Sequence, residues 1–407
     1  MLQSRRTGTR VKPFYNPPSL LLRQAASALY FGYIVGWRKF PHWLSKGTRT
    51  LPTAAGAIGM GCIGFPIHPI WEVTGACNLR CEQCHASSGK IAPDELNTEE
   101  GKRLLDSIAA IKEFRMLALG GGEPLVRPDI FELVAHARGL GLEISIATNG
   151  TLLTPEMARE FKKMGVANIA VGLNANDELV HEQITRVRGS FARSKNAVFA
   201  TLEAGMNLQI NTTVMKENRP AIPGLLDFAS EVGAQIVLLY QLVPEGRGSK
   251  DMELSLQEYQ SLTEMVAGKQ KTNRASIEPT CSPQYWAYLI SRNGNKPSRL
   301  TVRLAEALFK GCVAGSGLCY VKPDGQVWPC PFVPISAGNV REHSLGELWY
   351  ESELFNSLRD RERLTGQKCS TCCFKYLCGG CRGRAYTHYG DYLGDDPLCF
   401  LYSANGQ

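Results

Sequence analysis

Three cysteines lie close together near residue 80: Cys77, Cys81 and Cys84, with the spacing C-x3-C-x2-C. They directly follow an apolar segment over residues 69–74. Thiolates held this close can bind one metal centre, and soft sulfur ligands select iron–sulfur clusters or zinc. Because a structural zinc ion or an electron-transfer cluster takes four protein ligands, a set of three leaves one metal position open to a small molecule.

At these residues the sequence resembles the radical S-adenosylmethionine (radical SAM) superfamily, in which the same cysteine spacing follows the first strand of a barrel. The resemblance implies that Cys77, Cys81 and Cys84 hold a [4Fe-4S] cluster whose fourth iron is chelated by SAM. In that family an electron from the cluster cleaves SAM, and the resulting 5'-deoxyadenosyl radical abstracts a hydrogen atom from the substrate. A zinc knuckle is the alternative interpretation of the spacing.

Between residue 69 and about residue 240, apolar strand-like runs alternate with amphipathic helical stretches, a pattern typical of βα units around a parallel sheet. Asn97 followed by Glu100 predicts a helix that begins with a capping box. Six units are predicted, with strands over residues 69–74, 116–119, 143–147, 167–171, 207–214 and 235–240. Helices are expected at residues 97–112, 128–138, 154–163, 190–204, 221–232 and 256–269.

Glycine-rich and polar stretches lie just past several predicted strands, where parallel α/β folds bind their ligands. The run Gly120 to Pro124 is by itself only a tight turn, but it resembles the family's segment that hydrogen-bonds the SAM amino group. The resemblance implies SAM contacts from Gly121, Gly122, Glu123, Pro124, Asn149, Asn174 and Arg188. Asn174 stands where the family commonly has an acid, and it keeps hydrogen-bonding capacity without the charge.

A second set of eight cysteines lies in the C-terminal third of the chain: Cys312, Cys319, Cys330, Cys369, Cys372, Cys378, Cys381 and Cys399. Eight thiolates equal two complete four-ligand metal sites. Between Cys319 and Cys330, a turn sequence around Gly325 predicts a hairpin that presents Cys330. Two zinc ribbons are an alternative, because C-x2-C pairs suit zinc equally well.

This array resembles the SPASM extension of radical SAM enzymes, although its spacing before Cys381 is one residue shorter than the common form. The implied fold class is α/β: a partial (β/α)6 radical SAM barrel over residues 69–300, preceded by an arm over 1–68 and followed by a small cysteine-rich SPASM domain over 301–407. The implied cofactors are SAM and three [4Fe-4S] clusters. Of the two auxiliary clusters, the first is expected on Cys312, Cys319, Cys330 and Cys381, and the second on Cys369, Cys372, Cys378 and Cys399.

Cys62, Cys281 and Cys373 belong to neither set. Cys281, between Pro279 and Pro283, either lies near the substrate or is a small buried apolar residue, and base rates favour burial. Two arginines beside Cys381 also have two interpretations. Arg382 or Arg384 either pairs with a substrate carboxylate or supports the cluster loop, which we favour.

Clustered cysteines in a chain of 407 residues indicate metal ligation in a reducing compartment, so a cytoplasmic location is expected. Of the net charge of +7, residues 1–50 contribute nine Lys or Arg and no acid, which leaves about −2 for the rest and no basic stripe for a nucleic acid. An apolar run over residues 25–37 is too short to cross a bilayer, which takes about 20 residues. It predicts either an interfacial helix in peripheral membrane contact or a helix packed on the barrel or on a partner.

The C-terminal motifs resemble a SPASM subgroup that includes haem and haem d1 biosynthesis enzymes and peptide maturases of the mycofactocin type. The resemblance implies an enzyme that oxidatively modifies a peptide or a tetrapyrrole, supplied with electrons by a low-potential donor. Pro331 stands where sulfatase maturases carry an acid, which argues against that activity. A non-enzymatic electron carrier would explain the second cysteine set but not the open three-cysteine site with its glycine-rich companion.

Overall fold

The computed structural model describes residues 18–39, 68–114, 116–292 and 297–401. Its centre is a nine-stranded sheet with the order β7-β6-β5-β4-β3-β2-β1-β8-β9. Neighbouring strands are parallel, except that β8 and β9 form an antiparallel pair. The strands are β1 (His68–Glu72), β2 (Met116–Gly120), β3 (Glu143–Thr148), β4 (Asn168–Gly172), β5 (Asn207–Val214), β6 (Ile236–Gln241), β7 (Ser276–Thr280), β8 (Leu318–Val321) and β9 (Val327–Trp328).

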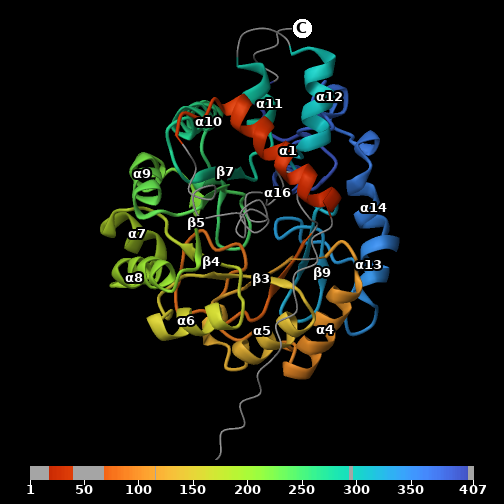
Figure 1. Cartoon of the computed structure of the whole chain (residues 1–407). Helices are drawn as coiled ribbons and strands as arrows, with labels where there is room; N and C mark the ends of the chain where they lie inside the picture. The colour runs from red at the N-terminus through yellow and green to blue at the C-terminus, as the bar shows by residue number, and fades with distance from the viewer. Residues whose placement is uncertain (1–17, 40–67, 115, 293–296, 402–407) are drawn as a thin grey trace, which may run out of the picture.

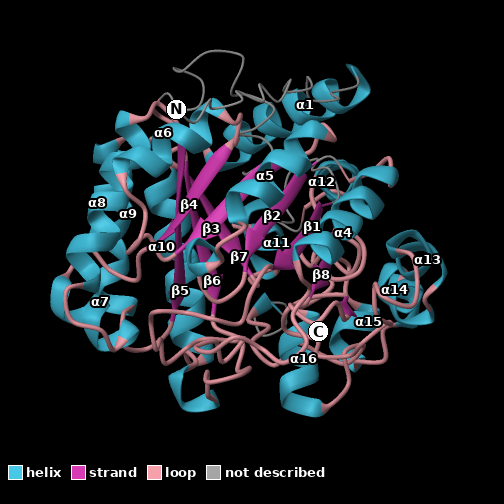
Figure 2. Cartoon of the chain, turned by 90° about the horizontal axis from the view of Figure 1, so that it is seen from below, coloured by secondary structure: helices cyan, strands magenta, loops and turns pink. Residues whose placement is uncertain are grey.

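Helices follow one another around the outside of this sheet (Figures 1 and 2). They are α4 (Thr98–Ala110), α5 (Ile130–Gly139), α6 (Pro155–Lys163), α7 (Glu178–Thr185), α8 (Ser190–Glu203), α9 (Ile222–Val232) and α10 (Leu256–Gln270). Several begin where a polar side chain caps the first turn: Asn97 forms the expected capping box with Glu100, and Thr154 caps α6.

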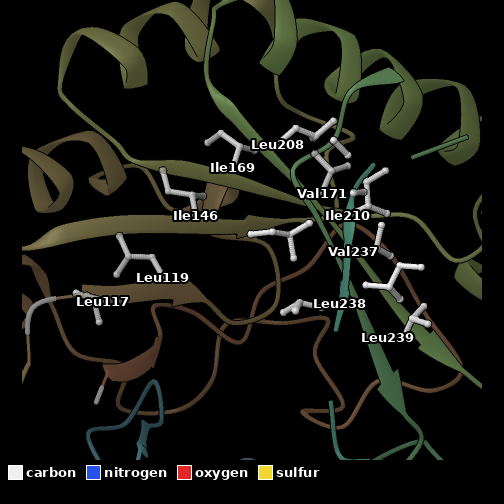
Figure 3. Packing of buried hydrophobic residues seen from close by; sticks show 14 of the residues in the cluster. Leu117, Leu119, Ile146, Ile169, Val171, Leu208, Ile210, Val237, Leu238 and Leu239 are labelled. Atoms are coloured by element: carbon white, nitrogen blue, oxygen red, sulfur yellow. The ribbon is translucent and has the colours of Figure 1, made fainter. Parts of the chain in front are cut away.

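The two faces of the sheet differ, because successive side chains of a strand point to opposite sides. Toward the helices the strands present fully buried branched residues that form one hydrophobic core (Figure 3); among them are Leu117, Leu119, Ile146, Ile169, Val171, Leu208, Ile210 and Val237. The alternate positions carry small or polar residues such as Ala118, Ser145 and Asn211, and these line a cavity inside the curved sheet. The helix side therefore supplies the core, and the inner face remains available for a ligand.

The predicted α/β class and partial barrel are confirmed: the sheet does not close, since β7 and β9 form its two edges. Each of the six predicted strands is present. Helix α7 and strand β7 were not predicted. The expected hairpin before Cys330 is also present, formed by β8 and β9.

Strand β8 comes from the segment predicted to form the C-terminal domain, yet it pairs in parallel with β1. Strands from both sides of the predicted domain boundary at residue 300 therefore belong to one sheet. The α-helices that follow β9 are α13 (Leu345–Glu351), α14 (Glu353–Arg359), α15 (Gln367–Thr371) and α16 (Arg382–Tyr389).

All but the last two residues of the apolar run over 25–37 lie in helix α1 (Pro18–Val35), which packs against α11 (Gln284–Ser291) and α12 (Arg299–Leu308). Phe31 is buried beside Trp286, with ring centroids 5.6 Å apart, and Tyr30 stacks on Phe309 at 5.7 Å. The helix therefore packs on the barrel, as one of the two alternatives predicted. None of the described helices is both long and apolar enough to span a bilayer.

Candidate SAM and iron–sulfur cluster site

A cavity of about 380 Å³ opens at the carboxyl ends of the strands. Its wall combines inner-face residues of the sheet with residues of the loops that follow β1, β3, β4 and β7, and with the segment around Cys330 and Cys381. Cysteines of both sequence sets line it, namely Cys81, Cys84, Cys312, Cys330 and Cys381, and so does Cys281, which belongs to neither set. The fold thus brings the two predicted cluster regions to one internal space.

The three-cysteine loop follows β1, and its thiols lie close enough to influence one another electrostatically. Burial raises the pKa of Cys77 and raises that of Cys81 to about 12, and the neighbouring cysteines add to both shifts. Thiols that resist ionisation in one another's presence are suited to a cationic metal centre, which stabilises the thiolate form. The Leu79 amide donates to Cys77 Sγ at 3.4 Å, and Asn149 Nδ2 donates to the same sulfur at 3.8 Å.

Arg247 supports this loop although sequence patterns place it only in a glycine-rich stretch after a predicted strand. Its guanidinium donates to the carbonyl oxygens of Cys81 and Ser88, both at 2.8 Å, and its amide donates to the Cys84 carbonyl at 2.9 Å. The positive charge also acts to lower the pKa of Cys81. Arg247 therefore fixes the loop that carries Cys81 and Cys84.

Gly121 and Gly122 pack their backbone against the end of β1 and the start of the cysteine loop. The Gly122 amide donates to the Thr74 carbonyl at 2.8 Å, and a Cβ at Gly122 would lie 2.0 Å from the Ala76 carbonyl oxygen. Gly121 has φ +127°, which side chains rarely adopt. Both glycines line the cavity, so backbone contact with the cysteine loop accounts for them beside any role toward SAM.

Glu123 is fully buried behind this turn and is not among the residues that line the cavity. Its carboxylate accepts from Thr148 Oγ1 and the Asn149 amide, each at 2.7 Å, and from the Leu125 amide at 3.0 Å. Burial raises the pKa of Glu123 to about 6, while these donors act to lower it. Glu123 thus joins the turn after β2 to the turn after β3; Pro124, also buried, starts a short 3-10 helix behind it.

Asn149 and Asn174 both line the cavity, at the ends of β3 and β4. Asn174 Oδ1 accepts from Gln83 Nε2 at 3.2 Å, and the backbone N–H of Asn174 donates to His181 Nδ1 at 3.2 Å. Burial lowers the pKa of His181 to about 4, which keeps this acceptor nitrogen unprotonated. Arg188, by contrast, is exposed and does not line the cavity.

A second group of polar residues lines the cavity away from the predicted SAM contacts, and sequence patterns did not identify it. His85 Nε2 and Tyr320 Oη lie 3.1 Å apart, and the buried Glu72 forms an ion pair of 3.0 Å with Lys322. Burial, together with the nearby Glu72 carboxylate, raises the pKa of Tyr320. Of these residues, Glu72, His85 and Tyr320 line the cavity, and they come from β1, the cysteine loop and β8, three segments whose proximity depends on the β1 to β8 pairing.

The cysteines expected to hold the second auxiliary cluster gather around Cys378. Burial raises the pKa of Cys378, and the thiols of Cys399, Cys369 and Cys372 add to the shift. Backbone amides of Phe374 and Gly380 donate to Cys372 Sγ at 3.4 Å and to Cys378 Sγ at 3.5 Å. In the described residues no three His, Cys, Asp or Glu side chains approach closely enough to hold a single metal ion. This does not argue against a [4Fe-4S] cluster, because a cluster is larger than a single ion and its cysteine ligands would lie farther apart.

The first auxiliary set is divided. Cys312, Cys330 and Cys381 line the cavity, whereas Cys319 is buried in the hydrophobic core and does not. Cys281 lines the cavity with the first three, Cys373 is exposed, and Cys62 lies outside the described residues.

Arg382 and Arg384 are fully buried, and their guanidinium groups contact the protein itself. Arg382 donates to the carbonyls of Tyr392 and Gly394 and to Cys369 Sγ, the last at 3.8 Å. Arg384 donates to Asp396 through Nη1 at 3.1 Å. Both guanidinium groups thus bind the chain around the C-terminal cysteines, as the second of the two predicted roles requires.

Two protein-family models match the chain: the radical SAM superfamily over residues 71–229 and the SPASM iron–sulfur cluster-binding domain over residues 312–373. The AdoMet-dependent heme synthase of Methanosarcina barkeri is 38% identical over 332 residues, covering 81% of this chain and 95% of that protein. The heme synthase of Nitratidesulfovibrio vulgaris is 35% identical, covering 81% and 90%. Mycofactocin maturase MftC of Mycolicibacterium smegmatis is 29% identical, covering 82% of each chain.

Among solved structures, SuiB of Streptococcus suis bound to S-adenosylmethionine superposes with a TM-score of 0.65 at 20% identity, covering 83% of this chain and 78% of that one. This likeness concerns the fold. The sequence relatives and the family models carry the assignment further, because the matched ranges contain the three-cysteine loop and most of the second cysteine array. The chain belongs to the radical SAM superfamily and is an enzyme of that superfamily with a C-terminal SPASM domain.

Proposed function

We propose that this enzyme oxidatively decarboxylates propionate side chains of an iron porphyrin. The observation that carries the proposal is the similarity to AdoMet-dependent heme synthases, which at 33 to 38% identity exceeds the 29% found for the peptide maturase MftC over a similar length. The cavity supports a small-molecule substrate: its volume of about 380 Å³ falls in the range of ligand sites, and Tyr320, Pro331 and Phe332 offer flat apolar contacts.

The proposed cofactors are SAM and three [4Fe-4S] clusters. Cys77, Cys81 and Cys84 would hold the cluster that binds SAM, and the glycine turn with Asn149 and Asn174 would surround SAM itself. Cys369, Cys372, Cys378 and Cys399 would hold one auxiliary cluster, while Cys312, Cys330 and Cys381 would supply three ligands of the other. When bound to the reduced cluster, SAM supplies the 5'-deoxyadenosyl radical that removes a hydrogen atom from the substrate.

Removal of one hydrogen atom, followed by loss of carbon dioxide and one electron, converts a propionate into a vinyl group. The chain orients the substrate between its two cysteine regions and excludes water. His85 and Tyr320 are placed to contact it from the cavity wall. The departing electron needs an acceptor, and the cavity-lining cysteines of the C-terminal region would hold one beside the substrate. A low-potential donor protein would supply the electron that each SAM cleavage consumes.

The test is anaerobic incubation of the reconstituted enzyme with dithionite, SAM and an iron porphyrin that bears four propionates. We expect two products: 5'-deoxyadenosine, and a porphyrin that has lost carbon dioxide and two hydrogens per reacted side chain. Both are detected by mass spectrometry. A Cys77→Ala variant should form neither product. If 5'-deoxyadenosine forms but the porphyrin stays unchanged, the substrate assignment is wrong and the peptide alternative gains support.

We also propose peripheral membrane contact through helix α1. Its outward face is apolar, with Leu22, Leu29 and Tyr33 each more than 70% exposed, and these positions fall on one side of a helix. Leu300 of α12, a helix that packs against α1, is exposed as well, and residues 1–50 carry nine basic residues without an acid. An apolar stripe with basic residues is suited to an anionic lipid surface.

A further inference from the structure

Cys281 lies at the end of β7, on the wall of the cavity that Cys312, Cys330 and Cys381 also line. Its thiol lies close enough to those of Cys381 and Cys330 to interact with them electrostatically. Cys330 is in turn influenced by Cys312 and Cys381. Four sulfurs from separate segments thus form one connected group.

Cys319 lies on the opposite side of the sheet. Its neighbours on β8, Leu318 and Tyr320, line the cavity, and successive strand residues alternate in direction. The register with β1 agrees: Leu318 and Tyr320 pair with His68 and Ile70, which line the cavity as well. Cys319 and Val321 belong instead to the hydrophobic core, on the side of the buried Trp71.

We propose that Cys281, and not Cys319, is the fourth protein ligand of the first auxiliary [4Fe-4S] cluster, together with Cys312, Cys330 and Cys381. This inference rests on the auxiliary clusters of the proposed function. It assigns a barrel residue to a cluster whose ligands, by the resemblance to the SPASM family, were all expected in the C-terminal region. The cluster would then join the last barrel strand to the SPASM segment.

The backbone around Cys281 is built for this position. Cys281 has φ +57°, one of four positive values among the described non-glycine residues, and strained backbone of this kind gathers at functional sites. Its carbonyl accepts from Arg384 Nη2 at 2.7 Å, and the same guanidinium contacts Asp396 at 3.1 Å. Because Asp396 Oδ2 also accepts from the Cys381 amide at 2.8 Å, one buried ion pair fixes both cysteines.

Close packing at Gly311 brings Cys312 next to the loop that carries Cys281. A Cβ at Gly311 would lie 2.6 Å from Pro283 Cβ and 2.9 Å from the Cys378 carbonyl oxygen, so the loop after β7 touches the residue before Cys312. Only glycine allows the two segments to pack this closely.

The test measures iron and electron paramagnetic resonance (EPR) spectra in a Cys77→Ala/Cys81→Ala/Cys84→Ala background, where only auxiliary clusters remain. The reconstituted background should hold about eight irons per chain. Adding Cys281→Ala should lower this to about four, or convert one cluster to a three-iron form visible by EPR. Cys319→Ala, which removes a fully buried thiol, should keep about eight irons and the parent spectrum.

A Cys281→Ser variant distinguishes loss of a ligand from misfolding, because serine is similar in size to cysteine and its oxygen ligates iron more weakly than sulfur. We expect a native circular dichroism spectrum with an altered EPR spectrum of the reduced protein. Eight irons and an unchanged spectrum in both Cys281 variants would overturn the inference, as would loss of iron in Cys319→Ala alone. A background protein with only about four irons would contradict the two auxiliary clusters of the proposed function itself, which is a distinguishable failure.

Discussion

At the scale of single residues, the side chains that face the cavity depend on buried polar partners behind them. Asn174 is the clearest case, since its backbone N–H donates to His181 Nδ1 and its side-chain oxygen accepts from Gln83. His181 is 1% exposed, and it serves as an acceptor only while Nδ1 carries no proton. The position of a predicted SAM contact is therefore coupled to the protonation of a residue seven positions later.

Lowering the pH should destabilise the protein through His181. Its folded pKa of about 4 lies below the unfolded value of 6.5, so between these pH values the unfolded chain binds a proton that the folded chain does not. The free energy of unfolding should fall through this window by up to about 3 kcal/mol, and nothing further is lost below pH 4. Melting temperatures of wild type and His181→Gln between pH 5 and 7 check this, and parallel curves would rule the effect out.

Single residues also mark where the sequence stops being informative. The thiols of the three-cysteine motif lie close enough to interact electrostatically, because neighbours in one loop share a local geometry. The distant cysteines are different. The sequence motif includes Cys319 among the expected ligands and leaves out Cys281, whereas the direction of each side chain depends on strand register and backbone torsion. Neither quantity is visible in a cysteine spacing.

At the scale of elements, six strands and their helices follow from alternation and capping signals in the sequence. The sequence did not indicate β7, whose five residues include Pro279, a residue that normally weakens a strand prediction. Nor did it indicate that β8 pairs with β1, since this contact joins residues about 250 positions apart and depends on the open edge of the barrel. The elements that complete the cavity are thus the ones fixed by tertiary contacts.

The turn after β2 should tolerate no side chain at Gly122. A Cβ there would lie 2.0 Å from the Ala76 carbonyl oxygen, which is backbone of the cysteine loop and cannot move aside without displacing Cys77. Gly122→Ala should therefore lose the cluster of that loop, lowering reconstituted iron by about four per chain. Gly139→Ala is the matched control, because its Cβ would meet nothing within 4 Å. Equal iron in the two variants would show that the turn is more adaptable than its packing indicates.

At the scale of the whole molecule, one cavity connects the two cysteine regions, and the N-terminal helix lies on the outside of the barrel. Helix α1 is held on one side by Phe31 and Val35, which are buried, and by Arg292, whose Nη2 donates to the Ile34 carbonyl at 2.6 Å. Packing on the barrel thus leaves the opposite face of the same helix exposed. The two interpretations of the apolar run are therefore compatible, one for each face.

This exposed face predicts binding to anionic vesicles. Inserting one leucine side chain into the lipid interface gains on the order of 1.5 kcal/mol, so Leu29→Glu should weaken binding to phosphatidylglycerol vesicles by about tenfold or more. Leu179→Glu is a matched control, because Leu179 is 81% exposed and Leu29 77%, but Leu179 lies on α7 at the far side of the barrel. Salt should weaken wild-type binding, since part of the attraction comes from basic residues. Cosedimentation that is equal for wild type and Leu29→Glu, or absent for wild type, would refute membrane contact through α1.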